Sequence, residues 1–178
     1  MVLYHGTDEI SANKIINNGI NPKEGKKRAD FGQGFYATPK KQHAIDRAQI
    51  KSKREGSPPV LIVLEFDELS AEGEIKHFSE ANLEWLQFVV NNRIGTKYVE
   101  RHNLPQSTHN RDSKYDVVIG DTADEDLVYL IMDIKSKDRL VKEEDLIMAG
   151  RGSLGVQYSF HTSKGISNIK GNLSIEYV

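Results

Sequence analysis

The segment from Val60 to Phe66 is the strongest constraint on the fold. It reads Val-Leu-Ile-Val-Leu-Glu-Phe, a nearly continuous run of aliphatic and β-branched residues. Such runs are typical of strands that are covered on both faces, because each side chain must be buried whichever way it points. We therefore predict a strand in the middle of a sheet.

The rest of the chain mixes strands and helices without a regular alternation. Apolar spacing and capping residues predict further strands at residues 2–5, 115–120, 156–160 and 173–178, the last at a sheet edge, and helices at residues 10–18, 39–54, 79–93, 127–134 and 162–169. A further helix is expected after Asp138, a long surface loop at residues 96–114, and a glycine-rich hinge at residues 150–155. Because the order lacks a βαβα repeat, the pattern favours the α+β class over a doubly wound sheet.

Length and composition suit one compact domain over residues 1–178. The chain has 178 residues and 38% apolar content, within the roughly 100–200 residues usual for a domain. No run approaches the roughly 18 apolar residues of a membrane span, and the N-terminus lacks a signal-peptide pattern. We therefore expect a soluble, cytoplasmic protein with no membrane partner.

Composition also excludes several kinds of chemistry. With no cysteine, the chain has no disulfide framework, thiolate nucleophile or cysteine-bound metal. Its six histidines show no metal-ligand spacing, so no metal is expected. The formal net charge is only −2, which gives no overall electrostatic reason to bind nucleic acid.

Three short strings carry groups that can contact a dinucleotide. They are Tyr4-His5-Gly6-Thr7, then Asp30 to Thr38, and then Gln157 to Phe160. The His5 imidazole, at a strand end, can bond a ribose hydroxyl, and the missing Cβ of Gly6 lets a flat ring lie against the backbone. Gly32 and Gly34 flank a turn into an aromatic pair, in which one ring serves the core and the other, Tyr36, a ligand.

Such a set suits cleavage of the nicotinamide N-glycosidic bond of NAD. The leaving group is a neutral heterocycle that departs from a cation, and the transition state resembles a ribosyl oxocarbenium ion. The protein therefore mainly holds and polarises its substrate, through backbone contacts to the carboxamide, an aromatic face on the ring and partners for the ribose hydroxyls. The three strings predict a pocket for NAD.

The same strings resemble signature strings of ADP-ribosyltransferases of the His-Tyr-Glu class, which includes poly-ADP-ribose polymerases and diphtheria-type toxins. The chain is similar, more closely, to a bacterial family of uncharacterised domains with that fold. This resemblance spans nearly the whole length and rests on five strings: Leu3–Gly6, Asp30–Thr38, Trp85–Phe88 with Asn92-Arg93, Tyr115–Asp124 and Gln157–Phe160. It implies an ADP-ribosyltransferase-like split β-sheet core with surrounding helices.

The resemblance also implies roles for individual residues. His5 would contact the adenosine-side ribose, Gly6 would pair with the nicotinamide carboxamide through its backbone, and Tyr36 would stack on the nicotinamide ring. The remaining members of the implied NAD-binding set are Thr7, Gly34 and Arg28. Arg28 would reach the pyrophosphate from its loop as a charge-assisted donor.

The third catalytic position departs from the class. Where the class has a glutamate, this chain has Gln157, whose carboxamide can accept from the ribose 2′-hydroxyl but supplies no charge to the cation growing on the sugar. That loss would raise the barrier by about 2–4 kcal/mol. The implied catalytic set of Gln157, Tyr36 and His5 therefore fits mono-transfer, slow turnover or NAD binding alone. Ala44 and Arg47 stand near the places of a serine and a tyrosine of the polymerases, which disfavours a polymerase.

Three functions remain open. The first is an NAD-dependent ADP-ribosyltransferase that modifies an unidentified protein or nucleic acid. The second is an NAD glycohydrolase or phosphorylase, and the third is a non-catalytic module that binds NAD or ADP-ribose. The family context favours the first function, as the toxin of a bacterial toxin–antitoxin pair with an antitoxin protein as a partner.

The site residues also have structural interpretations. His5 alternatively satisfies backbone groups at a strand end, Tyr36 serves as a half-buried core aromatic, and Gln157 is a strand residue that faces solvent. Arg93 is interpreted mainly as helix termination. Asp124 either caps a helix or lines the pocket.

Overall fold

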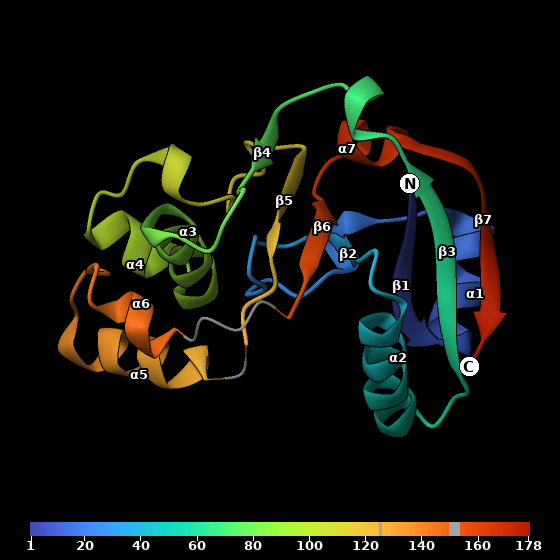
Figure 1. Ribbon diagram of the computed structural model, residues 1–178, viewed down its shortest axis with the longest axis horizontal. Coiled ribbons are helices and arrows are strands. Elements are labelled where there is room, and N and C mark those ends of the chain that lie inside the picture. The colour runs from blue at the N-terminus through green and yellow to red at the C-terminus, as the bar shows by residue number, and fades with distance from the viewer. Residues whose placement is uncertain (125, 150–153) are drawn as a thin grey trace.

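The computed structural model describes residues 1–124, 126–149 and 154–178, which form two β-sheets with helices around them (Figure 1). The strands are β1 (Val2–Asp8), β2 (Phe35–Ala37), β3 (Pro59–Phe66), β4 (Ile75–His77), β5 (Val117–Asp121), β6 (Val156–Phe160) and β7 (Ile169–Tyr177). One sheet has the order β1-β3-β7 and the other the order β2-β6-β5-β4. Neighbouring strands are antiparallel except for β4 and β5, which are parallel.

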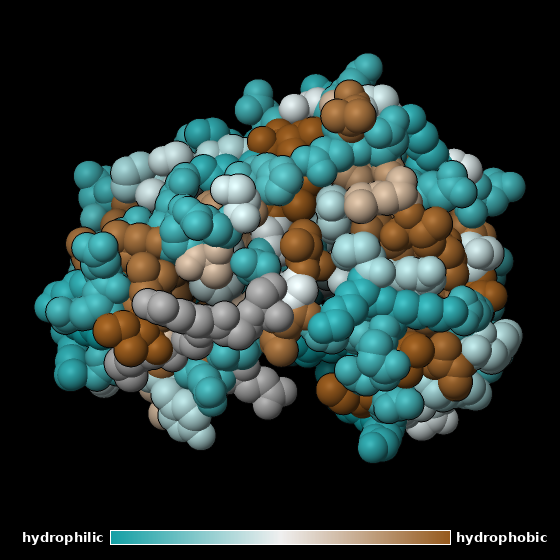
Figure 2. Space-filling view, viewed as in Figure 1, coloured by the Kyte–Doolittle hydropathy of each residue, from teal (hydrophilic) through white to brown (hydrophobic). Residues whose placement is uncertain are grey.

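The helices fall into two groups. They are α1 (Glu9–Asn18), α2 (Lys41–Glu55), α3 (Leu83–Ile94), α4 (Thr96–Arg101), α5 (Leu127–Lys137), α6 (Asp145–Met148) and α7 (Ser163–Ser167). Helices α1 and α2 accompany the three-stranded sheet, whereas α3 to α6 form a lobe on the other side of the four-stranded sheet (Figure 1). Figure 2 shows a notch in the surface below the start of β6, between α2 and the lobe of α5 and α6. The class is α+β, as predicted.

Strand β3 lies in the middle of the three-stranded sheet, and its first half is covered on both faces. Val60 and Ile62 pack against Ala12 of α1, while Leu61, which points the other way, packs against Ala44 of α2. The alternation of side chains along a strand places consecutive residues on opposite faces. The first half of the apolar run is therefore explained by helices on both sides, whereas Leu64 and Phe66 pack in the core between the sheets. The prediction of a central strand is confirmed.

In the part of the chain that the structure describes, one pair of residues joins the two sheets by backbone hydrogen bonds. Tyr4 of β1 donates its N–H to the Thr38 carbonyl at 2.9 Å, and Thr38 donates to the Tyr4 carbonyl at 3.0 Å. Beyond this pair, a shared apolar core fills the space between the sheets, with Leu64 and Phe66 on one side and Phe160 on the other. The junction holds β1 next to β2.

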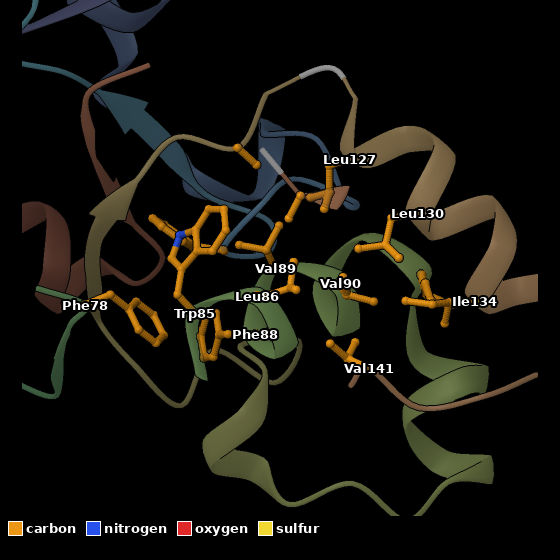
Figure 3. Close-up of a cluster of buried hydrophobic side chains, with 14 of the residues drawn as sticks. Phe78, Trp85, Leu86, Phe88, Val89, Val90, Leu127, Leu130, Ile134 and Val141 are labelled. Atoms are coloured by element: carbon orange, nitrogen blue, oxygen red, sulfur yellow. The ribbon is translucent and has the colours of Figure 1, made fainter. Parts of the chain in front are cut away.

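The opposite face of the four-stranded sheet packs on α3, whose apolar side forms the largest core. Asn82 caps α3 by accepting from the Trp85 N–H at 3.0 Å, and the Trp85 indole donates to the Asp121 carbonyl at 3.0 Å. Figure 3 shows Leu127 and Leu130 of α5 pointing toward α3 within this core. The lobe is thus anchored to the end of β5.

Two helix starts differ from the predictions. The helix predicted at residues 39–54 begins at Lys41, because the Thr38 backbone before it pairs with β1 and the Thr38 hydroxyl donates to the Val156 carbonyl at 2.9 Å. The helix expected to begin at Ser79 begins at Leu83, with Asn82 as its cap. In the first case a contact outside the helix fixes Thr38, whereas in the second a different local residue, Asn82, provides the cap.

Two irregular segments also differ. The expected loop at residues 96–114 contains α4, a short helix of 6 residues. After Asp138, which has a left-handed φ of 46°, the chain becomes helical again only at α6. Residues 150–153 of the expected hinge lie outside the described residues.

Gly6 provides a test of the packing between α2 and β1. A Cβ built on Gly6 would lie 1.8 Å from the Ala44 carbonyl oxygen, so any larger residue must push the helix away. We expect Gly6→Ala to lower the free energy of unfolding by about 3 kcal/mol or more. Urea denaturation measures the loss.

Gly56→Ala is the matched control for this substitution. Gly56 has a left-handed φ of 67° and nothing within 4 Å of its Cβ position, so only backbone strain is added there. The expected loss is about 1 kcal/mol. Equal losses at the two positions would contradict the close packing at Gly6.

Candidate functional site

Tyr36 and Gln157 share one face of the four-stranded sheet. Tyr36 of β2 pairs with Ser159 of β6, and Gln157 lies two residues earlier on the same strand. Because side chains two residues apart on a strand point the same way, the Tyr36 ring and the Gln157 carboxamide lie on the face that packs toward α3. The start of β6 lies just above the surface notch of Figure 2.

The Tyr36 hydroxyl holds the glycine turn that precedes it. It donates to the Gly32 carbonyl at 2.7 Å and accepts from the Phe31 N–H at 3.0 Å. Burial, with the nearby charge of Asp30, raises the pKa of Tyr36 well above its ordinary value. The phenol is therefore neutral, and its hydroxyl is used in hydrogen bonds within the protein. Only the half-buried ring is left to contact a ligand.

The turn itself is glycine-rich for reasons of packing. Gly32 has a left-handed φ of 95°, and a Cβ on Gly34 would lie 2.7 Å from the His161 ring. His161 donates from Nδ1 to the Gln33 carbonyl at 2.9 Å, and its Nε2 lies 2.8 Å from the Ser159 hydroxyl. Burial lowers the pKa of His161 to about 4, so this ring is neutral and clamps the turn.

His5 lies at the junction of the two sheets. Its Nδ1 donates to the Tyr36 carbonyl at 2.6 Å, which leaves the lone pair of a neutral imidazole on Nε2. Burial, opposed in part by that hydrogen bond, lowers the pKa of His5 to about 4. Among the described residues, no group is hydrogen-bonded to Nε2, so this nitrogen can accept from a hydroxyl.

His5 contacts Tyr36 by a hydrogen bond to the Tyr36 backbone carbonyl, whereas its ring contact is with Phe35. The His5 imidazole stacks on Phe35, with ring centroids 4.3 Å apart. Phe35 and Tyr36 are consecutive on β2, so their side chains point to opposite faces. A ligand that touches both His5 and the Tyr36 ring must therefore cross the edge of β2.

Gly6 and Thr7 have structural partners in α2. Gly6 packs against the Ala44 carbonyl, as described above, and the buried Thr7 hydroxyl accepts from Lys51 at 3.0 Å. Lys51 also lies 3.3 Å from Asp8. Burial alone would raise the pKa of Asp8, but hydrogen bonds from Ser11 and Lys51 outweigh it and lower the pKa to about 2.

Arg28 lies on an exposed loop beside a second arginine. Its Nε is 3.5 Å, and Arg111 Nη1 is 3.8 Å, from the Cβ position of Gly95 at the end of α3. Burial and the charge of Arg28 lower the pKa of Arg111. No hydrogen bond or ion pair joins Arg28 to Tyr36 or Gln157 within the described chain.

Gln157 is bound to a buried carboxylate that sequence reasoning missed. Its Nε2 donates to Asp30 Oδ2 at 2.8 Å and more weakly to the Asp121 carbonyl at 3.5 Å. The other Asp30 oxygen accepts from Arg93 Nε at 2.7 Å and Nη2 at 2.6 Å, and Oδ2 also accepts from the Ala123 N–H at 3.2 Å. Asp30 and Gln157 are both buried, with exposed fractions of 7% and 9%.

The residues of this network belong to the strings on which the family resemblance rests. Asp30 opens the Asp-Phe-Gly string, and Arg93 closes the Asn-Arg pair. The interpretation of Arg93 as helix termination is incomplete, because its guanidinium binds Asp30. Asp124 accepts from the N–H groups of Asp126 at 3.0 Å and Leu127 at 3.3 Å, which fits the capping alternative.

The two histidines with strongly lowered pKa values predict how stability depends on pH. The pKa of His5 and of His161 falls from an ordinary 6.5 to about 4 on folding, so the unfolded chain binds more protons between these values. Stability should therefore fall as pH drops from about 6.5 to about 4, by about 2–3 kcal/mol per histidine. Urea denaturation at several pH values measures this loss.

The variants His5→Gln and His161→Gln show whether these two histidines cause the loss of stability at low pH. Each keeps a side-chain donor but cannot titrate, so each should remove part of the loss. The Asp8 carboxyl, whose pKa falls from an ordinary 3.8 to about 2 on folding, loses its contribution mainly below about pH 4. The assignment fails if the loss between pH 6.5 and pH 4 is unchanged in the double variant.

Comparison with known proteins gives one match. A family model described as a protein of unknown function (DUF3990) matches residues 1–170. No curated protein and no solved structure matches the chain. Across the described ranges, no helix is both long enough and apolar enough to pass through a membrane, and no three metal-ligating side chains gather at one place. Because the match covers nearly the whole length, the chain belongs to the DUF3990 family of proteins of unknown function.

Proposed function

We propose that this protein binds NAD and transfers its ADP-ribose to a macromolecule. The observation that carries the proposal is the placement of Gln157 and Tyr36 on one sheet face with His5 at its edge. The two sheets, which among the described residues share backbone hydrogen bonds only at the Tyr4–Thr38 pair, are consistent with the split core implied by the resemblance to ADP-ribosyltransferases.

The free hydrogen-bonding groups suit a nicotinamide nucleotide. His5 Nε2 is a neutral acceptor, and Gln157 Oε1 has no donor among the described residues. Each can accept from a ribose hydroxyl, and the Tyr36 ring offers a flat surface to the nicotinamide. All three groups are uncharged at neutral pH, so the site would recognise the sugar and the ring rather than the phosphates.

The reaction breaks the bond between C1′ of the ribose and the nicotinamide nitrogen. The electron pair of that bond leaves with nicotinamide, which becomes neutral, and a nucleophile of the acceptor forms the new bond to C1′ and releases its proton to solvent. Gln157 would hold the 2′-hydroxyl without adding negative charge beside the cation. We therefore propose a slow mono-transfer, and, from the family resemblance, the role of a cytoplasmic toxin paired with an antitoxin protein.

Labelled NAD incubated with the protein and a cell lysate tests the proposal. Wild type should place label on a macromolecule. Gln157→Ala should transfer about tenfold less or worse, because one hydrogen bond to the sugar is lost. Tyr36→Ala should abolish transfer, since both the stacking surface and the anchor of the glycine turn are removed.

Two exposed residues of the same types provide matched controls. Gln42→Ala and Tyr129→Ala lie on α2 and α5, and both should transfer at the wild-type rate. Free ADP-ribose in place of labelled macromolecule would favour the hydrolase, and intact NAD with a thermal shift would favour a binding module. Undiminished transfer by Tyr36→Ala would refute the site.

A further inference from the structure

We infer that Asp30 is the positioning residue of this site, and that it turns the Gln157 carboxamide so that the oxygen, not the nitrogen, faces the NAD ribose. The inference rests on the proposed function for the ligand. The orientation of the amide stands on contacts within the protein and can be tested without NAD.

The orientation follows from the chemistry of the two acceptors that meet the amide. An ionised carboxylate accepts hydrogen bonds and cannot donate them, and the same holds for a backbone carbonyl. Asp30 Oδ2 lies 2.8 Å and the Asp121 carbonyl 3.5 Å from Gln157 Nε2. A reversed amide would bring Oε1 against both oxygens with no hydrogen between them, so Nε2 must face inward.

Asp30 is itself held from two sides. Arg93 of α3 binds Oδ1, and the Ala123 N–H, just after β5, binds Oδ2. A buried carboxylate with a guanidinium partner and an N–H donor has no freedom to rotate away from Gln157. The carboxylate is therefore a fixed reference for the amide.

The outward oxygen is the group left for a ligand. Gln157 has an exposed fraction of 9%, and no donor among the described residues reaches its Oε1. A hydroxyl group of a ligand can donate to this oxygen. Two ribose hydroxyls, one donating to Gln157 Oε1 and one to His5 Nε2, on a nucleotide that spans the edge of β2, have the required chemistry.

The same contact explains why an amide stands where the ADP-ribosyltransferase class has a glutamate. A second carboxylate at position 157 would face the Asp30 carboxylate at hydrogen-bond distance, and Arg93 is already shared with one of them. Two carboxylates at such a distance cannot both ionise. Asp30 and Gln157 thus form a matched pair, with the charge on the loop and the amide on the strand.

A cycle of four proteins tests the pairing without NAD: wild type, Asp30→Asn, Gln157→Glu, and the double variant that exchanges the two groups. In Gln157→Glu, Asp30 should raise the pKa of the new carboxyl above about 4.3, so the folded state binds more protons than the unfolded state. Stability should then fall as pH rises through that window. The double variant should not lose stability as pH rises through that window. Its free energy of unfolding should also be higher than the sum of the two single-variant effects predicts.

The surroundings of position 157 are otherwise common to the four proteins. Among the described residues, the other charged or titratable residues in contact with this pair or beside it are Arg93 on α3, Tyr36 on β2 and Asp121 on β5. Each is present in all four proteins. Coupling in the cycle therefore reports on the pair and not on its neighbours, even if Asp30→Asn alone is poorly folded.

NAD titration and transfer kinetics with the same four proteins test the direction of the amide. In Asp30→Asn, the new amide can donate to Gln157, which then turns Nε2 outward, so NAD should bind about tenfold more weakly. In the double variant, the new carboxylate accepts from the amide at position 30 and presents its other oxygen. NAD affinity should recover, and kcat should exceed that of the wild type by about tenfold or more, because a charge now faces the cation.

The possible outcomes separate three statements: the pairing of Asp30 with Gln157, the role of Asp30 in presenting the Gln157 oxygen, and the proposed function. Additive stabilities and an absent pH effect in Gln157→Glu would overturn the pairing, whatever NAD does. Coupled stabilities with unchanged NAD affinity in Asp30→Asn would overturn the role of Asp30 in presenting the oxygen. Coupled stabilities with no NAD binding by any of the four proteins would instead refute the proposed function and leave the paired amide confirmed.

Discussion

The buried carboxylate of Asp30 is the contact on which the candidate site depends. It joins four segments that are distant in the chain: the glycine turn, the end of α3, the residue after β5 and the start of β6. A buried charge is tolerated only when its partners are complete, and loss of one of them is expensive. The lobe of α3 to α6 and the four-stranded sheet are therefore fixed relative to each other at the place where Gln157 lies.

The second constraint is the junction of the two sheets. The backbone pair of Tyr4 and Thr38 lays β1 along β2, so the His5 imidazole reaches the Tyr36 carbonyl. Helix α2 packs closely against β1 at Gly6, and α1 covers the other face of the same sheet. Packing on both sides thus holds an imidazole with one free nitrogen at a sheet edge, and the glycine turn next to it is clamped by His161.

Local patterns in the sequence predicted the parts of the fold that local physics determines. The apolar run at residues 60–66 indicated a central strand, and Asn18-Gly19 indicated the end of α1, both of which the structure confirms. The start of α2 was predicted two residues too early because the pairing of Thr38 with Tyr4 is not local. Asp30 was missed for the same reason, since a buried ion pair with Arg93 leaves no periodic trace in either segment. The NAD site itself stays a prediction.

The most direct measurement is an NMR titration of the ¹⁵N-labelled protein with NAD. The Gln157 side-chain amide can be assigned from its disappearance in Gln157→Leu. We predict saturable shifts of this amide and of the backbone amides at residues 32–36 at or below millimolar NAD. The account would be contradicted if none of these signals moved, or if the shifts were confined to the depression between β3 and β7 that is lined by Val63, Lys170 and Asn172.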